Sequence, residues 1–292
     1  MLRDKISVGS KIFDVVNYTL LGLLALVMVI PFVHVVGSSF ATSAEIAETS
    51  FLLFPTEFSL NAYKYIFSTD TILRALLISV TVTVGGTLWS MFLSTLTAYG
   101  LSRKDLVGRR FFNFLIVFTI LFNGGMIPTF LVVEQTGLLN SLWALIIPVS
   151  INAFNMIILR SFFMNLPAGL EESAKIDGAS DFGILFRIVI PCSLPAIATI
   201  SLFYAVTYWN TYMHAILYIS DSAKWPVQVL LRQIVVLASG INYDGATYTD
   251  VPPPEVTVKM ATIVVATVPV LLVYPFLQKY FAKGALLGSV KG

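Results

Sequence analysis

Few side chains in this sequence could carry out covalent chemistry. The two histidines, His34 and His214, are far apart in the chain, and neither has a pair of carboxylates beside it in an apolar segment. The single cysteine, Cys192, excludes an internal disulfide and a zinc site built from cysteines. No Gly-x-x-x-x-Gly-Lys-Ser/Thr run is present, so this route to cradling nucleotide phosphates is missing. The sequence therefore predicts a protein without catalytic residues and without a metal site or a cofactor of its own.

Uncharged polar and aromatic side chains form the clearer pattern. Tyr204, Tyr208 and Tyr212 recur every four residues, so a helix would carry them on one face. Asn123 and Asn152 lie in apolar segments, where an unpaired amide is costly. Such amides must face protein or water, either in a hydrogen bond between helices or along a path for a polar solute. The tyrosines also suit core packing or an aromatic belt at a membrane interface.

The elements that hold these residues are predicted to be membrane-spanning helices. Of the 292 residues, 57% are hydrophobic and 12% are charged, which excludes an ordinary soluble domain. A bilayer core about 30 Å thick needs about 20 apolar residues per helix, and each long uncharged run supplies one crossing. The sequence predicts an all-α polytopic protein, a single domain over residues 1–292, with six transmembrane helices at about 15–37, 75–101, 111–133, 140–160, 194–218 and 258–279.

The basic residues predict the orientation. With these six crossings, thirteen of the eighteen Lys and Arg residues fall on the side of the N-terminus. Because Lys and Arg accumulate in cytoplasmic segments, both termini are predicted to be cytoplasmic. The external side then carries two long loops, 38–74 and 219–257. The first apolar run is long enough to span a membrane, so we expect an uncleaved helix and not a signal peptide.

Small residues form a stripe on the second predicted crossing. Gly86, Ser90, Ser94 and Ala98 follow one another at intervals of four residues. Helix backbones can approach one another closely along such a stripe. It predicts tight packing against another helix of the bundle.

The longest cytoplasmic segment, 165–191, is predicted to fold as two short helices. Pro167 suits the start of the first helix, and Gly178 marks its end. Ser180 can cap the second helix, which Pro191 is expected to end. Composition alone leaves open that this amphipathic pair rests on the lipid surface.

This segment resembles a motif of the inner-membrane permease subunits of bacterial ABC importers. The motif reads Glu-Ala-Ala, three residues, Gly, nine residues, then Ile-x-Leu-Pro. Here Glu172-Ser173-Ala174 is followed at these spacings by Gly178, Ile188 and Ile190-Pro191, with mild departures at Ser173 and Ile190. Further runs resemble the carbohydrate branch of the family, which includes maltose-type and alginate-type permeases: Leu53-Phe54-Pro55, Asn123 to Pro128, and Tyr208-Trp209-Asn210.

The resemblance implies the fold of a type I importer permease, with segment 165–191 docked in a groove of an ATPase subunit. It also implies a homologous sister permease, two cytoplasmic ATP-binding subunits that hold ATP and Mg, and an extracytoplasmic solute-binding protein. The complex would lie in the lipid of the bacterial inner membrane, and no nucleic acid partner is expected. The residues that the resemblance assigns to coupling with the ATPase are Glu171, Glu172, Ser173, Ala174, Asp177, Gly178, Ile188 and Pro191.

The cargo implied by the resemblance is a sugar or an oligosaccharide. Sugar hydroxyls need hydrogen-bond partners, and sugar C–H faces stack on aromatic rings, so a path should combine amides and aromatics without fixed charge. The sister permease could instead carry most of the solute contacts. The alternative is a stand-alone secondary carrier or a membrane scaffold, although no predicted crossing has a charge at its centre, as ion-coupled carriers commonly do. The candidates for the solute path are Asn123, Asn152, Asn155, Tyr204, Tyr208, Trp209, Asn210 and Tyr212.

Overall fold

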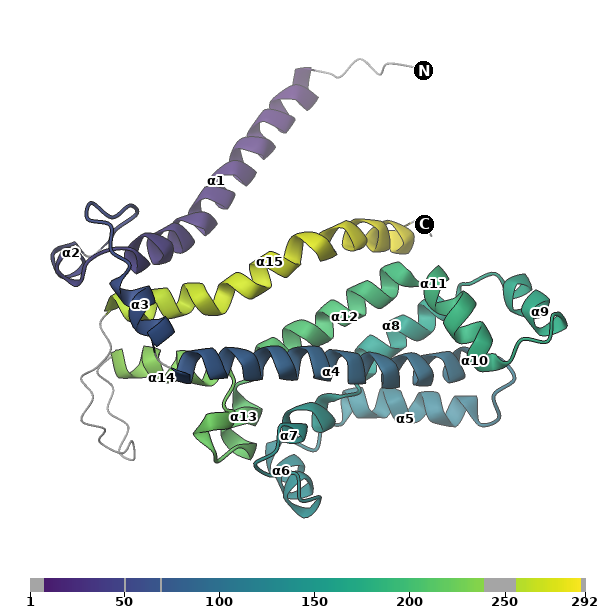
Figure 1. Cartoon of the computed structure of the whole chain (residues 1–292). Coiled ribbons are helices and arrows are strands. Elements are labelled where there is room, and N and C mark those ends of the chain that lie inside the picture. The colour runs from purple at the N-terminus through teal and green to yellow at the C-terminus, as the bar shows by residue number, and fades with distance from the viewer. Residues whose placement is uncertain (1–7, 50, 69, 239–255, 290–292) are drawn as a thin grey trace. The chain divides into compact units, whose positions relative to one another are not determined.

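The computed structural model describes residues 8–49, 51–68, 70–238 and 256–289, whose regular elements are all helical (Figure 1). The chain packs as two compact units, and the single permease domain stays a prediction. Unit 1 comprises residues 1–69 and 231–267, and unit 2 comprises residues 70–230 and 268–292. Helices α1 to α3 belong to unit 1 and α4 to α13 to unit 2, whereas α14 and α15 have residues in both.

The α-helices have these bounds: α1 Val8–Ser39, α2 Ser43–Glu48, α3 Asn61–Ser68, α4 Asp70–Ser102, α5 Arg109–Leu121, α6 Met126–Gln135, α7 Trp143–Ile146, α8 Ala153–Met164, α9 Ala168–Ile176, α10 Asp181–Ile184, α11 Ile190–Cys192, α12 Leu194–Trp209, α13 Met213–Tyr218, α14 Val227–Ala238 and α15 Val256–Ser289. Two short 3₁₀ helices cover Ile147–Val149 and Ser222–Lys224, and a π-helical turn covers Leu185–Val189.

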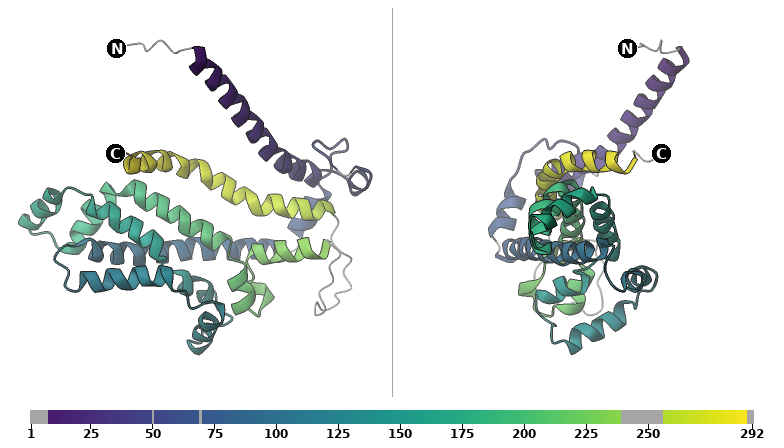
Figure 2. Two further views of the ribbon diagram at one scale, coloured as in Figure 1. Left: turned by 180° about the vertical axis from the view of Figure 1, so that it is seen from behind. Right: turned by 90° about the vertical axis from the view of Figure 1, so that its right-hand side faces the viewer.

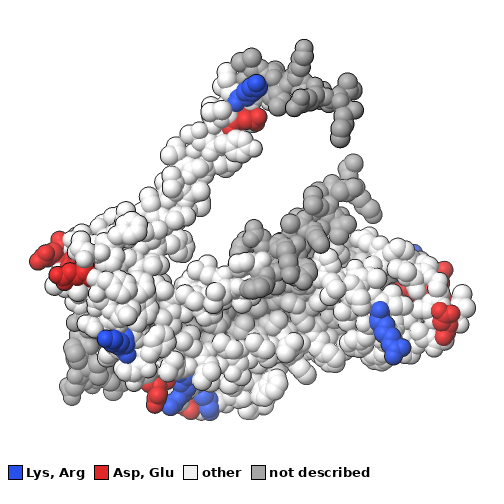
Figure 3. Space-filling view, turned by 45° about the horizontal axis from the view of Figure 1, so that its top comes forward, with Lys and Arg blue, Asp and Glu red and all other residues white. Residues whose placement is uncertain are grey.

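Three long helices coincide with predicted crossings. α1, α4 and α15 contain the predicted segments 15–37, 75–101 and 258–279, and each includes a stretch long and apolar enough to span a bilayer. On the face that Figure 3 displays, charged side chains form small separate groups with broad uncharged surface between them. This distribution agrees with helices whose sides face lipid or other apolar protein surfaces.

The other three predicted crossings are not continuous helices. Segment 111–133 is divided between α5 and α6, which meet at 117°, and segment 140–160 is divided by a bend of 56° before α8. Segment 194–218 is interrupted after α12, and α13 follows as a short helix. A further bend of 86° precedes α12. The described residues thus contain three long apolar helices and three bent helix pairs, each pair apolar enough for one broken span or re-entrant loop.

The break between α5 and α6 has a local cause. Gly125 has a φ of 88° and a ψ of 178°, a conformation that is essentially restricted to glycine. The side chain of Asn123 accepts a hydrogen bond from the Gly125 N–H at 2.9 Å, which replaces a helical partner. Hydropathy does not register this break, because the residues around it are apolar.

Unit 2 is organised around α4, which packs against α12, α8 and α5 (Figure 2). The small-residue stripe forms the contact with α12: Tyr208 Oη lies 2.7 Å from Ser90 Oγ, and Tyr204 Oη lies 2.7 Å from Ser94 Oγ. Both tyrosines are 1% exposed. A Cβ atom at Gly86 would lie 2.7 Å from Tyr208 Cζ. The predicted tight packing along this stripe is confirmed, and we call the contact the tyrosine–serine seam.

The first predicted external loop, 38–74, is structured. In unit 1 it contains α2 and α3, and its residues fold back on the end of α1, where His34 Nδ1 lies 2.8 Å from Leu52 O. The Thr56 N–H and hydroxyl both donate hydrogen bonds to the Glu45 carboxylate, and these bonds hold the pKa of Glu45 below its ordinary value. The described part of 38–68 is therefore folded against the end of α1 in unit 1 and is not an open loop, whereas residues 70–74 begin α4 in unit 2.

The second predicted external loop, 219–257, begins on a polar cluster in unit 2. Asn140 has a positive φ of 58°. Its side-chain Oδ1 accepts a hydrogen bond from the Asp221 N–H at 3.1 Å, and its carbonyl accepts one from Lys224 Nζ at 2.9 Å. The loop then enters α14, and residues 239–255 lie outside the described part of the chain.

Two adjacent glycines provide a test of the tyrosine–serine seam. Gly86→Ala should destabilise the protein, because the new Cβ would overlap the Tyr208 ring, and overpacking typically costs about 1–3 kcal/mol. Gly85 has open space around it, so Gly85→Ala should leave the stability unchanged or slightly raised. Thermal unfolding of the two purified variants in the same detergent measures the difference. Equal unfolding temperatures would contradict the proposed packing of the seam.

Candidate functional site

The predicted helix pair in segment 165–191 is present in unit 2. α9 ends in a Schellman motif, in which the Ala179 N–H donates to the Ala174 carbonyl at 2.9 Å. Gly178 occupies the left-handed position of this motif with a φ of 78°. The Ser180 side chain then caps α10. Both helices and the glycine turn between them are confirmed.

Pro191 does not end the second helix, as the sequence predicted that it would. Ile190 is helical, and the run from α10 continues through the π-helical turn Leu185–Val189 into α11, which ends at Cys192. In the π turn the Ile190 N–H donates to the Leu185 carbonyl, five residues earlier. This wider turn carries the helix into Pro191, which has no N–H to donate, and the chain bends by 86° before α12.

One face of α9 and of the following turn is open. Glu172, Ser173, Asp177 and Gly178 are exposed, as the coupling role implied by the resemblance requires. Ile176 is 87% exposed between them, although the sequence analysis did not select it. An exposed aliphatic side chain among carboxylates suits a helix that lays an apolar anchor into a groove of a partner.

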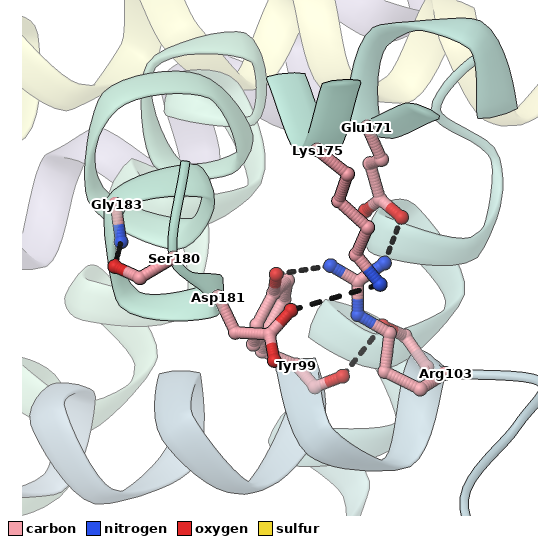
Figure 4. Close-up of polar contacts among 8 residues, drawn as sticks. Tyr99, Arg103, Glu171, Lys175, Ser180, Asp181 and Gly183 are labelled. Atoms are coloured by element: carbon pink, nitrogen blue, oxygen red, sulfur yellow. Dashed lines mark hydrogen bonds and ion pairs between the residues drawn. The ribbon is translucent and has the colours of Figure 1, made fainter. Parts of the chain in front are cut away.

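The remaining coupling candidates lie elsewhere. Ala174 is buried at 8% exposure, and Ile188 is half-buried and packs against the core of unit 2. Pro191 is exposed near the end of the second helix. Glu171 is bonded within the chain to the guanidinium of Arg103 (Figure 4). The set therefore divides into an open docking face and residues that fix the helix pair to the rest of unit 2.

Arg103 is the residue that the sequence analysis missed, because it entered only the argument on orientation. It follows the end of α4, 68 residues before Glu171. No spacing rule connects two residues so far apart, so only the fold brings them together. The one signal in the sequence is that a basic residue follows directly on a long uncharged run, 75–102.

An open cleft of about 640 Å³ lies beside this ion pair. Lys175 Nζ lies 3.8 Å from Asp181 Oδ1 at its edge, and both side chains are at least half exposed (Figure 4). An exposed pair of this kind contributes little to stability. The cleft is lined by charged and apolar side chains, among them Tyr99, Arg103, Asp105, Lys175, Asp181 and Phe182.

Four candidates for the solute path are buried within unit 2. The hydroxyls of Tyr204 and Tyr208 are bonded in the tyrosine–serine seam, so these two rings pack helices together. Trp209 and Asn155 are each 6% exposed. The assignment of all four residues to the solute path stays a prediction.

The other amides lie at the breaks in the helices. Asn123 precedes α6, Asn152 caps α8, and Asn210 follows α12, and all three residues are exposed. Each side chain bonds to the local backbone: to the Gly125 N–H at 2.9 Å, to the Asn155 N–H at 3.0 Å and to the Val206 carbonyl at 2.9 Å. Irregular backbone at membrane depth is tolerated only inside protein or beside water. These three amides are therefore the exposed candidates for solute contact.

Tyr212, the last candidate, precedes α13. It is half-buried and packs against the core of unit 2, three residues after the end of α12. The helix break separates it from Tyr208, so the three tyrosines do not form one continuous helical face. Tyr204 and Tyr208 lie on one helical face, as predicted, but Tyr212 does not share it.

Comparison with known proteins identifies the family. A family model described as the binding-protein-dependent transport system inner membrane component matches residues 86–286. The chain is 66% identical over 284 residues to the polygalacturonan/rhamnogalacturonan transport system permease protein YtcP of Bacillus subtilis (strain 168), covering 97% of this chain and 99% of that protein. It is 51% identical to Protein LplC of the same organism, over 97% and 96% of the two chains.

A solved structure agrees with this assignment. The crystal structure of a bacterial ABC transporter involved in the import of the acidic polysaccharide alginate contains a chain that is 34% identical. The two chains superpose with a TM-score of 0.86 over 94% of this chain and 98% of the other. The fold of a type I importer permease, expected from the coupling motif, is confirmed. The chain belongs to the family of inner-membrane components of binding-protein-dependent transport systems and is a membrane permease subunit.

Proposed function

We propose that this chain is a permease subunit of an ATP-driven importer for oligosaccharides derived from acidic polysaccharides. The observation that carries the proposal is the 66% identity, over almost the full length of both chains, to a permease of a polygalacturonan/rhamnogalacturonan transport system. The transporter of the solved neighbour imports alginate, which is also an acidic polysaccharide. A shared cargo class across both comparisons favours an acidic over a neutral saccharide.

The open face of α9 supports docking of an ATPase subunit. In the proposed complex, two such subunits bind ATP and Mg, and this chain pairs with a homologous sister permease. Closure of the ATPases on ATP displaces α9, and the bundle opens toward the external solute-binding protein. Hydrolysis of ATP by the partners then allows release inward, with both termini of this chain in the cytoplasm.

The contribution of this subunit to solute contact comes from uncharged groups. The predicted crossings that contain Asn123, Asn152 and Asn210 have no Lys or Arg near their centres. Amide donors at the helix breaks can bond sugar hydroxyls and carboxylates without a fixed cation. A polyanion bound by several fixed cations would be released slowly, so an uncharged path suits transport.

The cargo can be tested with the reconstituted complex and its solute-binding protein. Oligogalacturonides should stimulate ATP hydrolysis several-fold, because only a loaded binding protein that fits the permeases triggers closure. Neutral maltooligosaccharides of equal length are the control. Equal stimulation by both sugars, or stimulation by the neutral sugar alone, would contradict the acidic cargo.

Gly178 offers a test of docking that depends on conformation alone. No atom lies within 4 Å of the position of a Cβ at Gly178, so only its left-handed φ restricts substitution. Gly178→Val should strain the turn by about 1–2 kcal/mol and weaken association with the ATPase about 5- to 30-fold. Gly178→Asn should bind nearly as the unmodified protein does, since asparagine tolerates this conformation. Co-purification of the ATPase measures both variants, and equal binding would argue against this turn as part of the docking site.

The orientation can be tested by labelling with a membrane-impermeant thiol reagent. In a Cys192→Ala background, Val107→Cys should react only from the cytoplasm and Ser68→Cys only from outside. Val107 is 90% exposed between α4 and α5, and Ser68 is exposed at the end of α3, so both sites are accessible. The reverse pattern would invert the proposed topology.

A further inference from the structure

The contact between Arg103 and Glu171 joins the docking helix α9 to the end of α4. The Arg103 guanidinium donates hydrogen bonds to the Glu171 carboxylate and to the Tyr99 hydroxyl (Figure 4). It also lies 4.3 Å from the centroid of the Tyr99 ring. The side chains of Arg103 and Glu171 are 16% and 23% exposed, so water screens this ion pair far less than it screens a surface pair.

The α4 side of this contact is firmly held. Tyr99 is 7% exposed and belongs to the last turns of α4. The Leu101 carbonyl, which has no helical partner at the end of α4, accepts a hydrogen bond from Arg160 Nε of α8 at 2.9 Å. Arg103 is therefore anchored to a part of unit 2 that cannot move independently of α4 and α8.

The α9 side has few other attachments. Among the described side chains of α9, only Ala174 is buried, and its small methyl group provides little contact area. The neighbouring ion pair, between Lys175 and Asp181, joins α9 to α10 and does not reach α4. A displacement of α9 therefore reaches α4 through the bond between Glu171 and Arg103.

From α4 the displacement has a continuous route to α12. In the tyrosine–serine seam, Ser90 and Ser94 of α4 are bonded to two buried tyrosines of α12. Closely packed contacts of this kind move as a unit, because separating them would leave buried hydroxyls without partners. The docking helix α9 is thus connected to α4, and α4 to α12, so a displacement of α9 can pass through α4 to α12.

We propose that Arg103 and Glu171 are positioning residues that transmit the motion of α9 to α4 during transport. This inference rests on the proposed function, in which α9 receives the ATPase. It assigns Glu171 to a contact inside the permease and leaves ATPase docking to the exposed face around Glu172 and Ile176. Loss of the pair should uncouple hydrolysis from transport without releasing the ATPase.

The test compares Arg103→Gln and Glu171→Gln in the complete complex, reconstituted with its solute-binding protein. Glutamine keeps the shape of glutamate but removes the ion pair. Both variants should retain the ATPase on co-purification, whereas solute imported per ATP hydrolysed should fall about fivefold or more. The double variant Arg103→Glu with Glu171→Arg should restore much of this ratio, which a merely destabilised protein would not do.

Lys175→Gln is the matched control, since it removes the exposed ion pair beside the same cleft. Its ratio of import to hydrolysis should equal that of the unmodified complex. Wild-type ratios in both glutamine variants would overturn the proposal, and so would loss of the ATPase from Glu171→Gln, because Glu171 would then be a docking residue. If no ATPase co-purifies even with the unmodified permease, the proposed function itself fails.

Discussion

The hydrogen bonds of two buried tyrosines hold the centre of unit 2 together. In apolar surroundings a phenol hydroxyl needs a partner, and Tyr208 Oη lies 2.7 Å from Ser90 Oγ and 3.2 Å from Ile146 O. Tyr204, bonded to α4 in the same way, accepts a hydrogen bond from the Asn152 N–H at 2.9 Å. The two rings therefore join α4 both to α12 and to the chain on either side of the break before α8. Because the rings lie against the α4 backbone, α4 must carry small residues there.

This arrangement explains how broken helices persist in an apolar environment. A break leaves backbone groups without helical partners, and each such group costs free energy in lipid. The tyrosines satisfy two of these groups at the break before α8, and Asn123 satisfies the Gly125 N–H at the break before α6. Asn123 remains exposed, so a side chain that stabilises a break is also one that a polar solute could reach.

The sequence predicted the parts of this structure that depend on local or periodic patterns. Long uncharged runs predicted α1, α4 and α15, and the glycine and serine of segment 165–191 predicted its turn and cap. The small residues of α4 predicted close packing against another helix, but nothing in the sequence pairs Ser90 with a tyrosine 118 residues later. Hydropathy did not register the breaks, because it measures transfer to lipid and not backbone conformation. Arg103 escaped prediction because an ion pair between distant segments leaves no periodic signal.

In the proposed mechanism, solute contact and transmission of motion depend on different parts of unit 2, one uncharged and one charged. Transport requires that the cargo leave the path, so strong fixed charges at its centre would oppose release of an acidic sugar. Transmission of motion has the opposite requirement, because α9 would move without α4 if the contact between them broke. A partly buried arginine–carboxylate pair meets this second requirement, since breaking it leaves two poorly hydrated charges without partners. In the proposed transport cycle, the uncharged crossings let the cargo leave and the Arg103–Glu171 contact transmits the motion of α9.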